Sequence, residues 1–366
     1  MFPVSHRRCR NRPPAKGRRF PSFSIVNLFY FSVDNQKKLC YSCPRKEGEG
    51  MKTKERLLQV FEKNKGVYFS GEALASLLSV SRTAVWKGVC ALREGGYPID
   101  AVPNRGYCLS PETDILSAQG IEKYLLHPEL KLEVVDVTTS TNALLRQKAG
   151  EGAPEGTVVL SGCQTAGRGR LGRSFYSPAD TGIYMSLLLR PRAMAPSQAV
   201  KLTTMAAAAA CRAIAEVSGK DPGIKWVNDI FLEGKKVCGI LTEASLSLED
   251  GSLDAVVLGA GINVYPPAEG FPGELGGIAG AVFDTPQRDG KNRLAAAFLN
   301  RFFACYRGAE SWMDTYREKN LVVGREITVS GQRAAAVAID QDCRLVVRFP
   351  DGAEKALSSG EIQVKL

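Results

Sequence analysis

Residues 162–178 read GCQTAGRGRLGRSFYSP, and this stretch decides which kind of α/β fold the chain adopts. It follows an apolar strand pattern, TVVLSG, and residues 167–172 match G-x-G-x-x-G, the fingerprint of dinucleotide-binding folds. That fingerprint binds a dinucleotide only where a helix begins at the glycines. Here a turn-rich segment and a second strand pattern follow, so we exclude a Rossmann site and predict a glycine-rich loop between two strands.

The same loop carries Arg168, Arg170 and Arg173 between its glycines. Glycines let backbone N–H groups approach an anion, and guanidinium groups donate in pairs to phosphate or carboxylate oxygens. We therefore interpret the loop as a phosphate clamp that becomes ordered when its ligand binds. A solvated basic loop is the alternative.

Polar residues also follow the preceding predicted strand, which covers residues 132–137. Ser140, Thr141 and Asn142 stand between that strand and the start of a helix pattern. Because serine is a preferred N-cap, simple capping of the helix explains these residues better than a binding role does when the segment is taken alone.

After the loop we predict a helix over 197–218, a strand at IKWVND and a hairpin at FLEGKKVCGILTEAS that turns at Gly234. Another strand, DAVVLGAGINV, ends in a glycine-containing turn. Lys236 enters the apolar part of the hairpin, where a buried charge requires a partner. An anionic ligand would supply that partner.

Residues 51–110 predict three helices and a hairpin. The first helix covers about 52–64, Ser70 caps the second, Ser81 caps the third, and the hairpin turns at 104–106. This is the pattern of a winged helix, whose third helix enters the major groove of DNA, although such units also bind proteins. The expected DNA contacts are Ser81, Arg82, Thr83, Trp86, Lys87 and Arg105.

The distribution of charge supports DNA binding by that unit. The chain of 366 residues has a net charge of +10. Residues 1–50 hold 11 basic and 3 acidic residues, residues 51–110 hold 9 and 5, and the rest hold 28 and 30. The excess of positive charge therefore lies in the first 110 residues.

Histidine and cysteine usage excludes several kinds of chemistry. His6 and His127 are the only histidines, which argues against Ser/His/Asp and Cys/His catalysis and against His-ligated metals. Ten cysteines are scattered, seven of them in apolar runs, which indicates a reduced compartment rather than a disulfide scaffold.

The first fifty residues are basic and show no helical or strand period. A signal peptide is disfavoured because no small-residue cleavage site follows the apolar run. A zinc site is disfavoured because Cys40 and Cys43 form only a single CxxC. We interpret residues 1–50 as a disordered leader, or as sequence upstream of a natural start at Met51. The sequence contains no run of 18 uninterrupted apolar residues, so it does not predict a membrane-spanning helix.

At the other end, residues 321–366 alternate short strands with turns at Gly331, 340–342 and 351–352, which predicts an SH3-like barrel. A helix over 289–308 precedes it. The Gly/Pro-rich segment 264–280 is expected to be a loop that folds over a ligand.

Five segments then occur in a distinctive order: STN, GCQTAGRGRLGRSFYSP, KWVND, KKVCGILTE and GAGINV. Together they resemble the biotin–[acetyl-CoA-carboxylase] ligase family, in particular its bifunctional members, which are biotin–protein ligases and biotin-operon repressors. The resemblance covers roughly residues 51–366, and the winged helix matches the bifunctional branch. One departure is Val227, where the family usually has proline.

The resemblance implies an α+β protein with a winged helix-turn-helix over 51–110, a mixed-sheet catalytic domain over 111–320 and an SH3-like barrel over 321–366. Residues 111–131 would be a linker. It further implies a cytoplasmic enzyme, with no membrane association, that forms a homodimer when adenylate-bound.

The chemistry implied by the resemblance is ATP-dependent biotinylation. ATP, arriving with Mg²⁺, activates biotin as biotinyl-5′-adenylate, and a lysine of a biotin carboxyl carrier protein attacks it; no dedicated protein metal site is implied. Biotin is also the corepressor precursor for binding to operator DNA. Arg170 and Lys236 would be catalytic, and Trp226, Asn228 and Asp229 a supporting wall. The implied biotin-binding residues are Ser140, Thr141, Asn142, Gln164, Arg168, Gly169, Arg170 and Lys236.

Two alternatives stay open from the sequence. A lipoate–protein ligase-type enzyme is disfavoured by GRGRLGR and by the winged helix. A biotin-sensing repressor without catalysis is disfavoured by the presence of Arg170 and Lys236.

Overall fold

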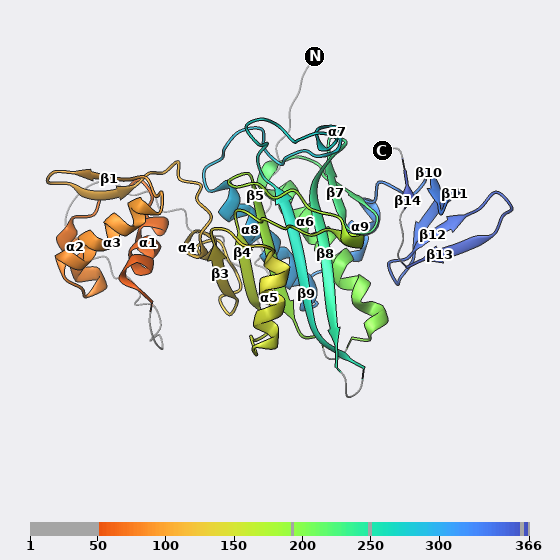
Figure 1. Cartoon of the computed structure of the whole chain (residues 1–366), viewed down its shortest axis with the longest axis horizontal. Coiled ribbons are helices and arrows are strands. Elements are labelled where there is room, and N and C mark those ends of the chain that lie inside the picture. The colour runs from red at the N-terminus through yellow and green to blue at the C-terminus, as the bar shows by residue number, and fades with distance from the viewer. Residues whose placement is uncertain (1–50, 192–193, 248–250, 359–361, 365–366) are drawn as a thin grey trace, which may run out of the picture. The chain divides into compact units, whose positions relative to one another are not determined.

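The computed structural model describes residues 51–191, 194–247, 251–358 and 362–364 (Figure 1). The interpretation of residues 1–50 as a leader, and the Cys40–Cys43 pair within it, lie outside the described residues.

The N-terminal elements form the predicted three helices and hairpin. They are α1 (Thr53–Lys63), α2 (Gly71–Leu78), α3 (Arg82–Glu94), β1 (Ile99–Val102) and β2 (Gly106–Leu109). The Ser70 hydroxyl accepts from the backbone N–H of Ala73 at 3.0 Å, and the Ser81 hydroxyl accepts from that of Ala84 at 3.1 Å. Both predicted caps are therefore confirmed, and the apolar faces of the three helices form a separate small core.

A seven-stranded mixed sheet forms the centre of the molecule, in the order β3-β4-β5-β9-β8-β7-β6. Only β3 and β4 run parallel among these neighbours. Its strands are β3 (Lys131–Val135), β4 (Thr157–Ser161), β5 (Gly182–Leu189), β6 (Gly223–Lys225), β7 (Asp229–Leu232), β8 (Lys235–Leu246) and β9 (Leu253–Asn263).

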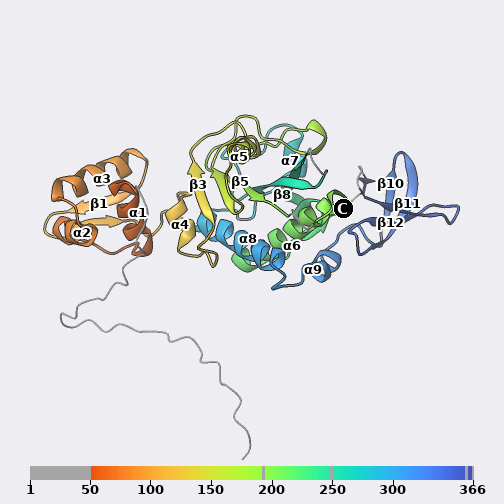
Figure 2. The ribbon, with the colours of Figure 1, turned by 90° about the horizontal axis from the view of Figure 1, so that it is seen from below.

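Helices cover both faces of this sheet, with α5 (Thr141–Gly150) on one and α6 (Ala199–Ser218) and α8 (Gly290–Tyr306) on the other (Figure 2). Because side chains alternate between the two covered faces, every residue of β4 is buried. Val159 packs in the cluster beneath α5, whereas Val158 and Leu160 join the larger cluster with α6 and α8.

The prediction that IKWVND is one strand is wrong. Strand β6 ends at Lys225, residues 226–228 turn, and β7 begins at Asp229, which pairs back with Lys225. The turn is held from outside the segment, because the Asn228 amide donates to the Ile240 carbonyl at 2.9 Å and the Trp226 indole N–H donates to the Cys343 carbonyl at 3.1 Å. These partners lie far along the chain, so the local pattern could not reveal the turn.

The C-terminal residues after α9 (Met313–Glu318) form a five-stranded antiparallel sheet in the order β13-β12-β11-β10-β14. The predicted turns separate its strands, and buried side chains such as Ile327, Leu345 and Val347 join the main core. The strands are β10 (Glu326–Val329), β11 (Gln332–Ile339), β12 (Leu345–Arg348), β13 (Glu354–Leu357) and β14 (Ile362–Gln363).

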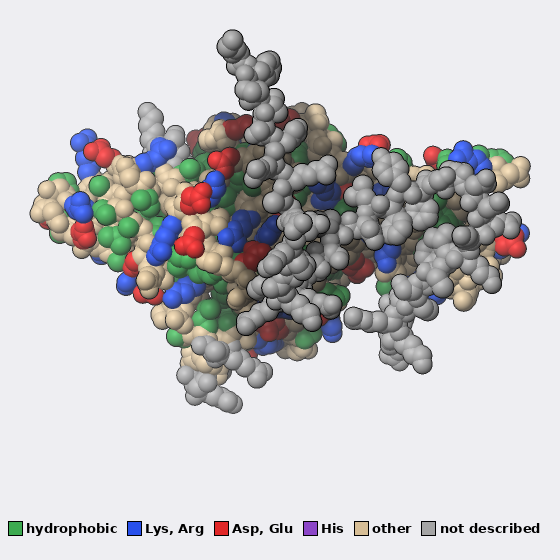
Figure 3. All heavy atoms as spheres, turned by 180° about the vertical axis from the view of Figure 1, so that it is seen from behind, with side chains coloured by type: hydrophobic (Ala, Val, Ile, Leu, Met, Phe, Trp, Pro, Cys, Tyr) green, Lys and Arg blue, Asp and Glu red, His purple; other side chains and the backbone are tan. Residues whose placement is uncertain are grey.

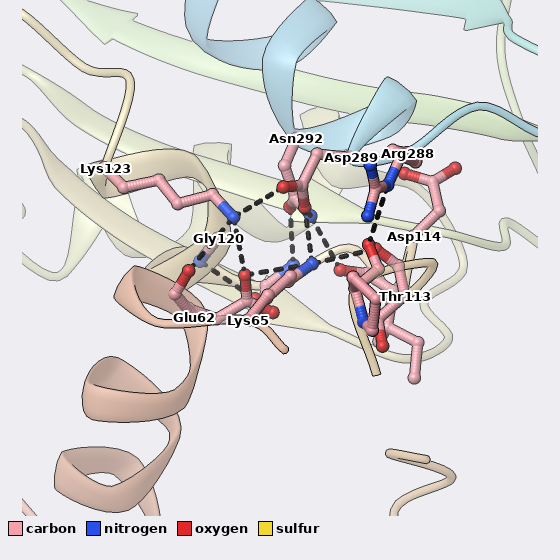
Figure 4. Close-up of polar contacts among 12 residues, drawn as sticks. Glu62, Lys65, Thr113, Asp114, Gly120, Lys123, Arg288, Asp289 and Asn292 are labelled. Atoms are coloured by element: carbon pink, nitrogen blue, oxygen red, sulfur yellow. Dashed lines mark hydrogen bonds and ion pairs between the residues drawn. The ribbon is translucent and has the colours of Figure 1, made fainter. Parts of the chain in front are cut away.

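Four charged side chains, two of them buried and two partly buried, connect α1 and the turn that follows it with the chain around Lys123 and Asp289 (Figure 4). Lys65 lies 2.6 Å from Asp289 and 3.2 Å from Glu62, and Lys123 lies 2.6 Å from Asp289 and 2.8 Å from Glu62. Lys123 follows the short helix α4 (Ala118–Glu122), and Asp289 precedes α8. We name these four residues the ionic joint.

The pKa values of the joint reflect its pairing. Burial alone would raise the pKa of Asp289, but the hydrogen bonds from Lys123 and Lys65 hold it below its ordinary value. Burial would likewise lower the pKa of Lys123, and its bonds to Asp289 and Glu62 raise it instead. Asp289 and Lys123 are therefore each charged over a wider range of pH than they would be in water.

The seven cysteines that lie in apolar runs are free thiols, as predicted, and none of them forms a disulfide within the described residues. Burial raises the pKa of Cys211 and of Cys238 to about 12. These thiols are therefore protonated and poor nucleophiles at neutral pH. In the described part of the chain no helix combines the length and hydropathy that a membrane span requires.

Candidate functional site

A cavity of about 480 Å³ lies against the sheet, bounded by the start of α5, the glycine–arginine loop, the β6–β7 turn and strands β8 and β9. Two residues of the last described segment, Ile362 and Val364, also line it. All of the predicted ligand-site residues meet here, namely Ser140, Thr141, Asn142, Gln164, Arg168, Gly169, Arg170, Trp226, Asn228, Asp229 and Lys236.

Glycines of β9 make room for two side chains of the cavity wall. A Cβ atom at Gly259 would lie 2.3 Å from Asn142 Oδ1, and one at Gly261 would lie 2.7 Å from the Phe175 ring. Asn142 and Phe175 therefore pack directly on the strand backbone. Phe175 and both glycines lie in sequence motifs far apart along the chain, so the motifs alone did not predict this contact.

Hydrogen bonds orient the Ser-Thr-Asn segment and Gln164. The Gln164 Oε1 atom accepts from the Thr141 backbone N–H at 2.9 Å, and its amide group donates to the Ser177 hydroxyl at 3.0 Å. Ser140 is the N-cap of α5 by position, but its hydroxyl makes no capping hydrogen bond. The alternative of simple side-chain capping is therefore wrong for Ser140.

The loop is connected to the β6–β7 turn through Arg170. Its guanidinium donates to Asn228 Oδ1 at 2.9 Å, and Asn228 in turn donates to the backbone of β8. The loop also bonds to itself, since the Gly169 N–H donates to the Arg173 carbonyl at 2.7 Å. Asn228 is thus a support for Arg170, in keeping with its predicted place in the wall.

Lys236 has an acidic partner within the protein. Its ammonium lies 2.8 Å from the Asp229 carboxylate, and both side chains are partly exposed to the cavity, at 29% and 24%. The sequence predicted that Lys236 requires a partner and left Asp229 to the wall. The pair places a positive charge in the wall while keeping it accessible to an anionic ligand.

Lys225 is a further cation of the cavity that the sequence analysis missed. Its ammonium lies 5.7 Å from the Phe231 ring centroid, and within the described residues no ion pair to a carboxylate engages it.

The Gly/Pro-rich segment 264–280 contributes no described residue to the lining of the cavity. It is bound to β8 instead, because the Lys235 ammonium donates to the carbonyls of Gly276 and Gly277 in α7 (Leu275–Ile278).

The predicted DNA contacts lie on the outer side of α3 and on the wing. Ser81, Arg82, Thr83 and Lys87 are exposed, and Trp86 is 56% exposed despite its size. The Arg105 guanidinium lies 4.1 Å from the centroid of the Tyr68 ring. On the face of the molecule seen in Figure 3, acidic and basic side chains are interspersed.

Comparison with known proteins gives matches for the segment that contains the cavity and for the N-terminal helices and hairpin. Residues 134–263 match the biotin/lipoate A/B protein ligase family, and residues 53–108 match an HTH domain. The bifunctional ligase/repressor BirA of Bacillus subtilis is 36% identical over 252 residues, which cover 68% of this chain and 76% of that protein. The chain belongs to the bifunctional BirA ligase/repressor family.

Two further likenesses agree with membership of the BirA family. BirA of Escherichia coli is 33% identical over 199 residues, which cover 54% of this chain and 60% of that protein. The structure of a biotin protein ligase from Aquifex aeolicus in complex with biotin and ATP superposes with a TM-score of 0.51 at 24% identity, covering 64% of this chain and 97% of that one. The latter shows that the fold is shared.

The departure from the family at Val227 leaves the wall of the cavity in place. Val227 is 3% exposed in the main core, and its carbonyl accepts from the Tyr316 hydroxyl at 3.0 Å. Trp226 and Asn228 on either side still line the cavity.

Proposed function

We propose that this protein joins biotin to a lysine of a biotin carboxyl carrier protein at the expense of ATP, and represses transcription through its winged helix in response to biotin. The observation that carries the ligase half is the single cavity in which the Ser-Thr-Asn segment, the glycine–arginine loop and Lys236 meet. Membership of the BirA family supports both halves.

In the first step a biotin carboxylate oxygen attacks the α-phosphorus of ATP, and pyrophosphate leaves with the bond electrons. Ser140, Thr141, Asn142 and Gln164 hold the ring system of biotin. Negative charge develops between carboxylate and phosphate, where positioned donors lower the barrier. Arg168, Gly169, Arg170 and Lys236 supply those donors, with Arg170 and Lys236 as the catalytic residues. Mg²⁺ enters with ATP, as part of the substrate.

In the second step the unprotonated amine of the carrier lysine attacks the carbonyl carbon of the mixed anhydride. An amide bond forms, AMP leaves with the electrons of the cleaved C–O bond, and the nitrogen loses a proton. Neither step requires a histidine as base or nucleophile, which suits a chain that has only two histidines.

The finer organisation belongs to the same proposal. We divide the chain into a winged helix over 51–110, a linker over 111–131 within a catalytic domain that ends at 320, and an SH3-like barrel over 321–366. Winged-helix contacts to operator DNA come from α3 and Arg105. The adenylate-bound protein forms a homodimer through its central sheet, and it works in the cytoplasm.

A labelling assay tests the ligase half. Purified protein is incubated with ATP, biotin and a biotin carboxyl carrier domain, and the product is probed with streptavidin. We expect ATP-dependent biotinylation of the carrier. No modification of the carrier, or modification only when lipoate replaces biotin, would refute the biotin-ligase hypothesis. Arg170→Gly should release the adenylate and label bystander lysines, and a gel shift with and without biotin tests the repressor half.

A further inference from the structure

Asn142 is held in one orientation from three sides. Its side-chain amide donates to Glu243 Oε2 at 2.7 Å, and its carbonyl oxygen accepts from the Ser186 hydroxyl at 2.6 Å. The backbone at Gly259 leaves no room for even a methyl group between it and Asn142. Asn142 and Ser186 are buried at 4% and 0% exposure, so little water competes for these bonds.

Glu243 connects two elements that build the cavity. It lies on β8, the strand that also carries Lys236, and its second oxygen pairs with Arg146 at 3.0 Å. Asn142 and Arg146 are four residues apart in α5 and therefore share one face of that helix. A single carboxylate thus binds the first turn of α5 to β8.

The Glu243 carboxylate is the nearer of two acceptors that turn the amide of Asn142, the other being the Leu241 carbonyl at 3.4 Å. An ionised carboxylate only accepts hydrogen bonds, so the NH₂ group of Asn142 must face it and the oxygen must face Ser186. Ser186 has one hydroxyl proton, which this oxygen takes. The Ser186 oxygen also lies 2.8 Å from the Thr141 hydroxyl, which in turn donates to Gln164 Oε1 at 3.2 Å.

We propose that Glu243 is a positioning residue for the biotin-binding half of the cavity, acting through Asn142 on the donors and acceptors that Thr141 and its neighbours present. This inference rests on the proposed function. It concerns the shape and polarity of the wall, so it predicts an effect on biotin binding rather than on the rate of the bound complex.

Three variants of the full chain test this role. Glu243→Leu removes the acceptor, Glu243→Gln keeps an oxygen for Asn142, and Arg146→Ala removes only the exposed partner of the pair. The Kd for biotin is measured by calorimetry with biotin alone. The kcat and the KM for biotin come from biotin-dependent exchange between ATP and labelled pyrophosphate, which needs no carrier protein.

Glu243→Leu lets the Asn142 amide turn, which should cost biotin about one hydrogen bond to the wall. Both the Kd and the KM for biotin should therefore rise by about tenfold, with kcat within about threefold of the wild type. Arg146→Ala should stay within about twofold, because Arg146 is 43% exposed and Asn142 keeps its bond to Glu243. Glu243→Gln should resemble Arg146→Ala, since it still accepts from Asn142.

A wild-type Kd in Glu243→Leu would overturn the inference, as would a loss confined to kcat. If Glu243→Leu melts at a lower temperature, the Kd for biotin is compared between Asn142→Asp and the double variant Asn142→Asp/Glu243→Gln. Asn142→Asp places two carboxylates against each other and should weaken biotin binding. The double variant restores a donor–acceptor pair and should recover at least half of that loss in log Kd. No recovery refutes the inference, whereas absence of biotin-dependent exchange in the wild type refutes the proposed function instead.

Discussion

Lys123→Met should destabilise this protein far more than the loss of an exposed ion pair of equal length. Lys123 lies 2.8 Å from Glu62 and 2.6 Å from Asp289, and its side chain is 12% exposed. Methionine keeps much of the apolar stem but leaves two buried carboxylates to share Lys65. Removing one partner of a buried pair costs about 3–5 kcal/mol, against a typical total stability of about 5–15 kcal/mol.

Urea unfolding of the full chain, followed by far-ultraviolet circular dichroism, measures the loss. The matched control is Arg348→Met, because Arg348 lies 2.7 Å from Glu354 but the two side chains are 55% and 47% exposed. Exposed pairs of this kind contribute about 0–1 kcal/mol. The two variants therefore compare burial at nearly constant distance.

A second substitution sharpens the test. Adding Glu62→Gln to Lys123→Met leaves one positive and one negative charge in the joint, so the double variant should be more stable than Lys123→Met alone. A double variant that is less stable than the single one, or a Lys123→Met that loses no more than Arg348→Met, would refute the view that desolvated charge dominates at this joint.

Three further outcomes follow from the structure. Gly261→Ala should weaken calorimetric biotin binding by about tenfold or more, because the new Cβ would lie 2.7 Å from the Phe175 ring, whereas Gly277→Ala, with open space around it, should not. Lys87→Ala should weaken binding to non-specific duplex DNA and reduce the slope of log affinity against log salt by about one unit. The lowered pKa of Asp289 means that its stabilisation is present above the ordinary carboxyl pKa of about 4 and is lost as pH falls below it. The urea midpoint should therefore fall more in the wild type than in Lys123→Met over that range of pH.

Local signals were sufficient to predict the helices and the hairpin of the winged helix. Ser70 and Ser81 cap their helices through backbone groups three residues away, and such short-range bonds are visible in a sequence. The glycine–arginine loop was recognised because no helix pattern follows it. The residues at the cavity were predicted by family resemblance, which carries over positions but not contacts.

The tertiary structure alone decided how distant residues constrain each other. The β6–β7 turn depends on the carbonyls of Ile240 and Cys343, and the ionic joint unites Glu62 with Asp289 across most of the chain. Glu243 reaches Asn142 only because β8 pairs with β9, the strand against which α5 packs. Hydrogen bonds and ion pairs act within a few ångströms regardless of separation along the chain, so their partners follow from packing and not from periodicity or motif.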